Sequence, residues 1–233
     1  MDGEARGDVL INGGGTAVGG VCRTVRINGA GRISGDVDCQ DCTTNGSAVL
    51  QGDLRTENLR INGAGEVTGS AEVGRGHVRG NAKVGGDLKG KTWVVNGVAD
   101  VGGSVGAERL EVYGGIEVGR DCEVEVLEVR GWLTVRGMLN ADAIDVALFH
   151  RNSAVNAIGG ADIRIHAGRR LLVPARLVAD TIEGDDIELE NTTAKAVRGA
   201  RVVIGKGCDI GNVEYHLDLT VDPSAKVAQQ KQI

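Results

Sequence analysis

Cysteine is the residue type whose spacing in this chain most directly suggests chemistry. Cys39 and Cys42 form a single C-x-x-C pair, and Cys22 precedes Cys39 at a spacing of 17. Such thiols can bind zinc or exchange disulfides. A structural zinc site needs four ligands, and no second pair follows at the usual spacing. We therefore expect these thiols to be small buried core residues, with metal or redox chemistry as the alternative.

The histidines and the glycine-rich strings do not form a recognisable catalytic or phosphate-binding motif. None of the four histidines pairs with an obvious serine or cysteine nucleophile; they are His77, His150, His166 and His216. The string Gly205-Lys206-Gly207 does not join a long strand to a helix, as a phosphate-binding loop would. We therefore expect a protein that is not an enzyme, with no catalytic residue, no metal site, no cofactor and no small-molecule substrate.

Composition narrows the class of protein further. Aromatic residues make up 2% of the chain and apolar residues 41%, so the core must consist of small and β-branched side chains. The formal net charge of −6 argues against a nucleic-acid partner, because phosphate binding needs clustered cations. Five cysteines and no recognisable signal peptide favour a cytoplasmic location, and membrane association is left open.

Glycine recurs at a fixed spacing of 17 through much of the chain. Starting from Gly29, each step of 17 meets another glycine as far as Gly131. A second glycine column starts at Gly35 and is interrupted once, at Arg120. A fixed period of this length is typical of solenoid proteins, in which each repeat is one structural unit.

Apolar residues keep the same period. One apolar column consists of Ile33, Leu50, Val67, Val84, Val101, Val118 and Val135. Another consists of Ile27, Thr44, Ile61, Val78, Val95, Val112 and Val129. Within a repeat the columns are mostly separated by even spacings, which place alternate side chains on one face of a strand. Trp93 falls in an inward column and is expected in the core.

These repeats predict the fold. Each repeat holds about three short strands, and Asn-Gly pairs such as Asn45-Gly46 mark tight corners. One repeat then forms one coil, and successive coils pair in parallel at about 4.8 Å, so that like residues stack on like. The sequence therefore predicts an all-β protein, a single parallel β-helix whose three-sided coils each hold one repeat.

The β-helix is predicted to be one domain over residues 1–233. Residues 1–140 hold the regular coils, and the first coil is one residue short near Cys22–Thr24. Residues 141–227 hold less regular coils with a basic insertion near 166–177, and residues 228–233 form a short tail.

Two kinds of segment are similar to a known family. INGAG followed by V-x-G at Ile61–Gly69 has a counterpart at Ile27–Gly35. Near the C-terminus the segments are Glu183–Gly199, Val202–Tyr215 and Val221–Val227. Together they resemble the bactofilins, bacterial polymer-forming cytoskeletal proteins, and in particular the group found in Gram-positive spore-formers. The resemblance spans essentially the whole chain. It implies a right-handed β-helix, nucleotide-independent filaments and a scaffold role in positioning other proteins.

A β-helix has two open ends, and unpaired strand edges there invite pairing with another chain. We expect copies of this chain to stack end to end and form a homopolymer. The residues expected at the two ends are Val9, Ile11 and Val21, and Leu219, Val221 and Val227.

A second set of residues is expected to contact recruited proteins or the inner membrane surface. Tyr113 and Trp132 have outward-facing parity, and exposed aromatic side chains are good partner anchors. The basic residues Arg169, Arg170 and Arg176 could touch an acidic membrane or partner.

Two other functions remain open at this point. One is a monomeric β-helical module whose exposed face binds a partner protein. The other is a hexapeptide-repeat acyltransferase, because Val203–Gly211 resembles one such repeat locally. Acyltransferases of this kind repeat every six residues. The 17-residue period of this chain would fall out of step with a six-residue repeat within a few coils, which disfavours the acyltransferase.

Overall fold

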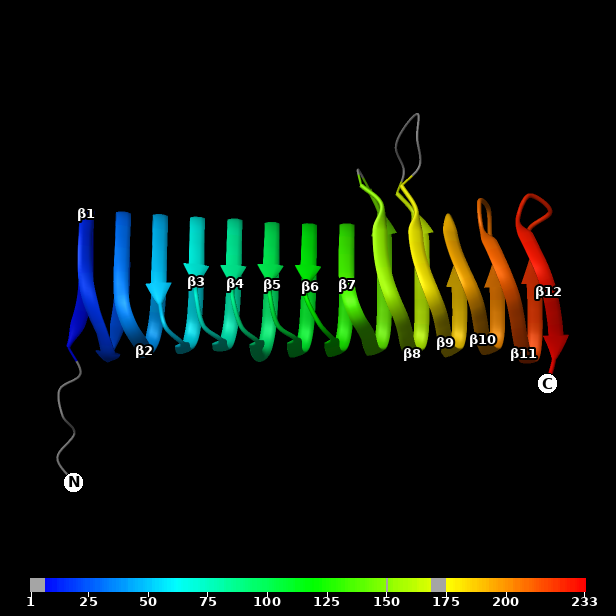
Figure 1. The fold of residues 1–233 in the computed structure, drawn as a ribbon, viewed down its shortest axis with the longest axis horizontal. Helices are drawn as coiled ribbons and strands as arrows, with labels where there is room; N and C mark the ends of the chain where they lie inside the picture. Colours follow the sequence, from blue (N-terminus) through cyan, green and yellow to red (C-terminus); the bar gives the residue numbers. More distant parts are fainter. Residues whose placement is uncertain (1–6, 150, 169–174) are drawn as a thin grey trace, which may run out of the picture. The chain divides into compact units, whose positions relative to one another are not determined.

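The computed structural model describes residues 7–149, 151–168 and 175–233, and these residues contain strands and no helix. All twelve strands are parallel members of one sheet and follow one another in sequence order (Figure 1). The predicted all-β class and parallel β-helix are therefore confirmed. The chain divides into two compact units, Met1–Glu108 and Arg109–Ile233.

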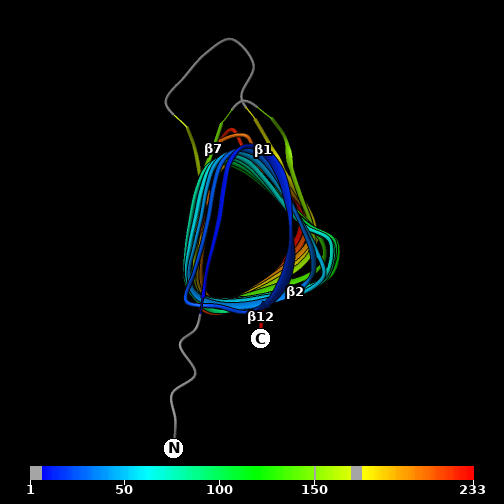
Figure 2. The same cartoon turned by 90° about the vertical axis from the view of Figure 1, so that its left-hand side faces the viewer.

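From its second strand onward, the first unit keeps a fixed register of 17 residues. Its strands are β1 (Asp8–Val21), β2 (Thr24–Gln51), β3 (Leu54–Val67), β4 (Ala71–Val84) and β5 (Leu88–Val101), and β6 (Val105–Val118) contains residues of both units. Val37 pairs with Leu54, Leu54 with Ala71 and Ala71 with Leu88, each at a spacing of 17. Viewed end-on, these coils trace a three-sided outline, as the repeat length predicts (Figure 2).

The core of this unit is built from the predicted columns. Ile27, Thr44 and Ile61 are buried on successive coils, as are Ile33 and the residues that follow it at steps of 17. Trp93 is also buried, as expected. Because like residues stack in register, each coil buries its apolar side chains against the coil before it.

Side-chain amides stack along one corner of the first unit. The Nδ2 of Asn28 donates to the Oδ1 of Asn12 at 2.9 Å, Asn45 donates to Asn28 at 2.9 Å, and Asn62 donates to Asn45 at 2.8 Å. Gly63, which follows the last of these, has a φ of +123°, a conformation that L side chains rarely adopt. The Asn-Gly pairs are therefore corner residues, as the sequence predicted.

The short first coil is real, but its missing residue lies elsewhere. Val18 pairs with Ser34, a spacing of 16, and Gly20 pairs with Val37, a spacing of 17. The register shift therefore falls between Val18 and Gly20, and the prediction near Cys22–Thr24 is wrong by a few residues.

The second unit is less regular than the first, and it contains residues 141–227, for which the sequence predicted irregular coils. Its further strands are β7 (Cys122–Leu148), β8 (Ser153–Ala167), β9 (Leu177–Leu189), β10 (Thr192–Ile204), β11 (Asp209–Val221) and β12 (Lys226–Gln232). Ser153 pairs with Leu177, a spacing of 24, and Leu177 pairs with Thr192, a spacing of 15. The connections between its coils therefore vary in length while the parallel pairing continues.

Two of the predicted segments can be located in this unit. The connection between β8 and β9 coincides with the basic insertion near 166–177, and residues 169–174 within it lie outside the described residues. The predicted short tail at 228–233 is wrong for most of its length, because β12 continues to Gln232 and pairs with β11.

Candidate functional site

The first strand leaves one edge of the sheet without a partner. β1 is first in the sheet order and pairs with β2 on one side, and none of the described residues forms a strand on its other side. In the described part of the chain, its backbone N–H and C=O groups along that edge have no partner strand. An edge of this kind is a template for pairing with a second chain.

The first coil also carries exposed apolar side chains on its outer surface. Leu10, Val18 and Val21 are 60%, 80% and 63% exposed. Their register partners on the second coil are the polar residues Arg26, Ser34 and Asp38. The outside of the first coil is therefore apolar at positions where the next coil is polar, which is a mark of an interaction surface.

The predicted end residues of this coil fall into two groups. Val9 and Ile11 pair with buried Val25 and Ile27, so they occupy core columns. Val9 is half-buried, because no coil formed by the described residues covers it. Val21 is not in a core column, because the register shift places it opposite outward-facing Asp38. A shift of one residue moves a side chain to the other face of a strand, so Val21, which was expected at this end of the β-helix, lies on its outer surface.

Leu10 and Val18 were missed by the sequence analysis. Both have outward parity, whereas the apolar columns of the repeat face inward. Comparing the outward-facing residues of the first coil with those of the second would have identified both, because the matching residues of the second coil are polar. Val9, Val18 and Val21 also line a cavity of about 170 Å³ that reaches inward to Cys22 and Val25. The end of the first unit is thus both apolar and hollowed.

The last coil of the second unit also leaves core columns uncovered. Leu219 and Val221 pair with buried Val202 and Ile204, yet both are half-buried. β12 pairs only with the first half of β11, from Asp209 to Tyr215, so no described strand covers the second half. The predicted end residues Leu219 and Val221 therefore lie where an added strand would bury them.

β12 itself is the more polar part of this end. Val227 pairs with buried Ile210 and is half-buried, so it continues a core column as predicted. The exposed residues of β12 include Lys226, Gln229, Gln230, Lys231 and Gln232. Two exposed apolar residues that the sequence analysis missed lie nearby, Leu217 at 64% and Ile233 at 47% exposure.

The two aromatic side chains predicted to contact partners, Trp132 and Tyr113, are less exposed than their outward-facing positions suggested. The guanidinium carbon of Arg151 lies 4.4 Å from the ring centroid of Trp132, which is half-buried. A Cβ at Gly115 on the preceding coil would clash with that indole, so the ring lies close against this glycine. Tyr113 is 39% exposed and donates a long hydrogen bond of 3.5 Å to Glu111. Of the two, Tyr113 is the more accessible.

The predicted basic contact lies only partly within the described residues. Arg176 is exposed, its backbone N–H donates to the Oδ1 of Asn152 at 3.0 Å, and its guanidinium donates to Thr193 at 3.2 Å. Arg169 and Arg170 lie outside the described residues.

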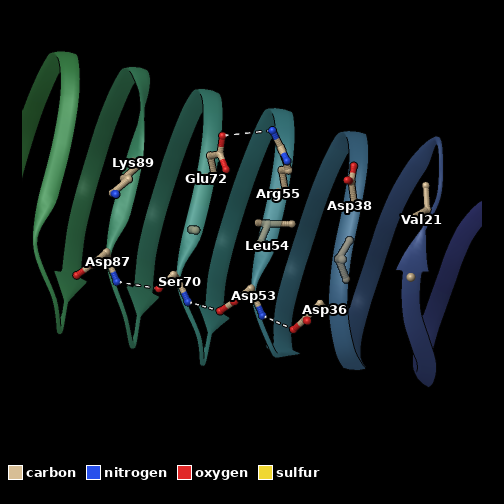
Figure 3. Close-up of a pocket in the computed structure, with 13 residues that line it drawn as sticks. Val21, Asp36, Asp38, Asp53, Leu54, Arg55, Ser70, Glu72, Asp87 and Lys89 are labelled. Atoms are coloured by element: carbon tan, nitrogen blue, oxygen red, sulfur yellow. Dashed lines mark hydrogen bonds and ion pairs between the residues drawn. The ribbon is translucent and has the colours of Figure 1, made fainter.

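A surface groove of about 390 Å³ follows one corner of the first unit (Figure 3). Along it, the backbone N–H of Asp53 donates to Asp36, that of Ser70 to Asp53, and that of Asp87 to Ser70, at 2.8, 2.8 and 3.2 Å. Arg55 pairs with Glu72 at 3.6 Å across adjacent coils. These side chains satisfy the corner backbone and one another, so we assign the groove a structural role.

The three neighbouring thiols are buried, as predicted. Cys22 and Cys39 lie on adjacent coils. They directly follow Val21 and Asp38, which form the last residue pair between β1 and β2. The pKa of Cys39 is lowered to about 7, chiefly because the Cys42 thiol hydrogen-bonds to it. Burial raises the pKa of Cys22 to about 11 and that of the remote Cys122 to about 12.

We expect Cys39 to be the most reactive thiol of this group. It borders a surface hollow of about 300 Å³, and the thiolate is the nucleophile in alkylation. At about pH 8, iodoacetamide should label Cys39 at least about tenfold faster than Cys122. Its rate should level off above about pH 7, whereas that of Cys122 should keep rising. Peptide mass spectrometry over time would measure both rates, and the fast phase should vanish in Cys39→Ala.

Neither a metal cluster nor a membrane-spanning helix occurs among the described residues. Within residues 7–149, 151–168 and 175–233, no three His, Cys, Asp or Glu side chains gather as a metal site would require. In the same part of the chain, no helix is long and apolar enough to cross a membrane.

Comparison with known proteins identifies close relatives. The chain is 57% identical over 225 residues to a protein of Bacillus subtilis strain 168 named as the uncharacterized protein YhbE, covering 94% of this chain and 95% of that protein. It is 38% identical over 92 residues to the uncharacterized protein YhbF of the same organism, covering 39% of each. No family model matches the chain. No solved structure matches it either.

Proposed function

The chain belongs to the family of YhbE from Bacillus subtilis, and we propose that it is a cytoskeletal scaffold protein of the bactofilin type, which assembles into filaments by end-to-end stacking of its β-helix. The observation that carries this proposal is the first coil. It combines an unpaired strand edge with exposed apolar side chains at Leu10, Val18 and Val21.

Stacking would satisfy both features of this coil at once. A strand from a second copy would pair with the free edge of β1 through backbone hydrogen bonds, as in β-strand addition. The same contact would cover the half-buried Val9 and remove apolar surface from water, which stabilises association by about 25 cal/mol per Å². The uncovered Leu219 and Val221 offer the corresponding surface at the last coil.

In this proposal the chain is not an enzyme and requires no nucleotide, metal or other cofactor. Its first partner is itself, and recruited proteins or the inner membrane surface are further contacts through residues such as Tyr113 and Arg176. No nucleic acid is involved, since the net charge is −6. The proposed location is the cytoplasm.

Negative-stain electron microscopy of the purified protein, without nucleotide, tests the proposal. We expect long uniform filaments whose abundance rises with protein concentration, and a matching fast-sedimenting fraction in the analytical ultracentrifuge. Discrete monomers or small closed oligomers at all concentrations would contradict filament assembly.

A second candidate function is a monomeric module that binds a different protein. It is favoured by the direction of Leu10 and Val18, which lie on the outer surface of the coil rather than in its core columns. In that case the purified chain should sediment as a monomer, and the same two side chains should be needed for partner binding.

A further inference from the structure

One outward face of β3 and β4 is hollowed and basic. Its hollow has a volume of about 370 Å³. The side chains that matter for its charge are Arg60 on β3, and Arg75, His77 and Arg79 on β4. Asn58 and Asn62 contribute amides, and no carboxylate is among the lining residues.

The register brings the three arginines to one place. Arg60 pairs directly with His77 on the next coil, and Arg75 and Arg79 lie two residues before and after that histidine. With coils about 4.8 Å apart and about 6.6 Å between alternate residues, Arg60 lies about 8 Å from each of the other two arginines. Arginine side chains are long enough for three guanidinium groups to meet over this hollow.

These arginines lack the partners that other cations on the same strands have. Arg55 on β3 pairs with Glu72 at 3.6 Å, and Lys83 on β4 pairs with Glu66 at 3.6 Å. Among the described residues, none of the three arginines of the hollow forms an ion pair. On this face the preceding coil carries Asp41, which accepts a hydrogen bond from Asn58 at 3.1 Å. The chain as a whole is acidic, so this cluster departs from its average charge.

An independent observation comes from His77. Its Nε2 is buried and has no hydrogen-bond partner among the described residues. Buried polar atoms are nearly always paired, and an exception calls for a missing water or ion. The atom belongs to the side chain at the centre of the arginine cluster. Unpaired cations and an unpaired ring nitrogen thus point to the same missing group, an anion with several acceptor oxygens.

We propose that this hollow is a phosphate-binding site, in which Arg60, Arg75 and Arg79 bind the oxygens of a phosphate group and His77 donates its Nε2–H to one of them. Guanidinium groups match phosphate geometry through paired N–H donors, which is why arginine dominates such sites. The phosphate belongs either to a soluble phosphate ester or to an anionic lipid headgroup. The site does not depend on filament assembly, since it lies within one unit of one chain.

Two probes test the site and distinguish its sources. Isothermal titration calorimetry with inorganic pyrophosphate measures a soluble ligand, and flotation with phosphatidylglycerol vesicles, against phosphatidylcholine vesicles, measures a lipid surface. We expect saturable binding of at least one probe that weakens as NaCl is raised. The double variant Arg75→Gln/Arg79→Gln should weaken it at least about tenfold, since each lost charged hydrogen bond carries about that factor.

Arg32→Gln is the matched control, because Arg32 is exposed in the same unit and lies outside the hollow. It should bind both probes as the native chain does, and all variants should keep the native unfolding midpoint. Binding of pyrophosphate supports a soluble ester, and binding of vesicles alone supports a lipid. If neither probe binds, or if Arg32→Gln weakens binding as much as the double variant, the proposal is wrong.

Discussion

Replacing Val18 by aspartate should abolish filaments while leaving the β-helix folded. Val18 is 80% exposed and points outward, so a carboxylate there is tolerated in the single chain. In a stacked contact the change would lose about 1.5 kcal/mol of apolar burial and add the desolvation of a charge, about 3 kcal/mol together. The protein concentration needed for filaments should therefore rise about a hundredfold. Sedimentation and electron microscopy would measure it.

Val178→Asp is the matched control for this variant. Val178 is a valine of β9 that is 48% exposed on the outer surface and away from either end coil. It should form filaments at the native concentration. Equal loss of filaments in both variants, or normal filaments in Val18→Asp, would contradict stacking through the first coil. Val9→Asp is a less selective test, because the core-facing position of Val9 would also affect folding.

Replacing Gly63 by alanine should strongly destabilise the first unit. Its φ of +123° is a conformation that alanine rarely adopts, and an added Cβ would press into the carbonyl oxygen of Gly46 on the preceding coil. Backbone strain and overpacking each destabilise by about 1–3 kcal/mol, so we expect a loss of about 3 kcal/mol or more. Denaturant unfolding followed by far-ultraviolet circular dichroism would measure the change.

Gly14→Ala is the control for this second prediction. A Cβ at Gly14 would meet no heavy atom within 4 Å, and its φ is outside the left-handed region. This variant should unfold within about 0.5 kcal/mol of the native chain. A Gly63→Ala protein of native stability would mean that neighbouring coils can separate locally to accept a methyl group.

The regular part of the fold was predictable because its register repeats. Each core column supplies one side chain per coil, and the parallel register confirms that residues one period apart, such as Val37 and Leu54, are direct neighbours. Even Thr44, a polar residue in an apolar column, is buried as its place in the column requires. Repetition gives several independent observations of each position, so single exceptions do not obscure the pattern.

The first coil could not be placed as accurately, because it is the one coil of its length in the regular part of the described chain. The shift falls at Gly19-Gly20, where no side chain indicates an inward or outward direction. The shift places Val21 on the outer face, opposite Asp38. At this end, the outward apolar positions Leu10 and Val18 could have been found from sequence by comparing them with the second coil.

The local sites depend on geometry that the period does not contain. Arg60 and His77 are one period apart, so the sequence alone predicts that they are neighbours on adjacent coils. That no carboxylate of the described residues pairs with the arginines around them could be seen only from the side-chain positions in the structure. Likewise, the hydrogen bond between the thiols of Cys39 and Cys42 depends on how the backbone turns between these two inward-facing residues, which the period does not specify.

The fixed register also constrains how chains of this kind can change length during evolution. Duplicating or deleting one whole period in the first unit adds or removes one complete turn and leaves every other residue above its former neighbour. A single-residue change within a turn must instead be absorbed by a local register shift, as in the first coil between Val18 and Gly20, or it would displace neighbouring stacks such as the asparagines from Asn12 to Asn62. In the regular region, the coil that is one residue shorter stands at the start of the described sheet, where one neighbouring coil accommodates it. Relatives should therefore differ in the regular region by whole turns.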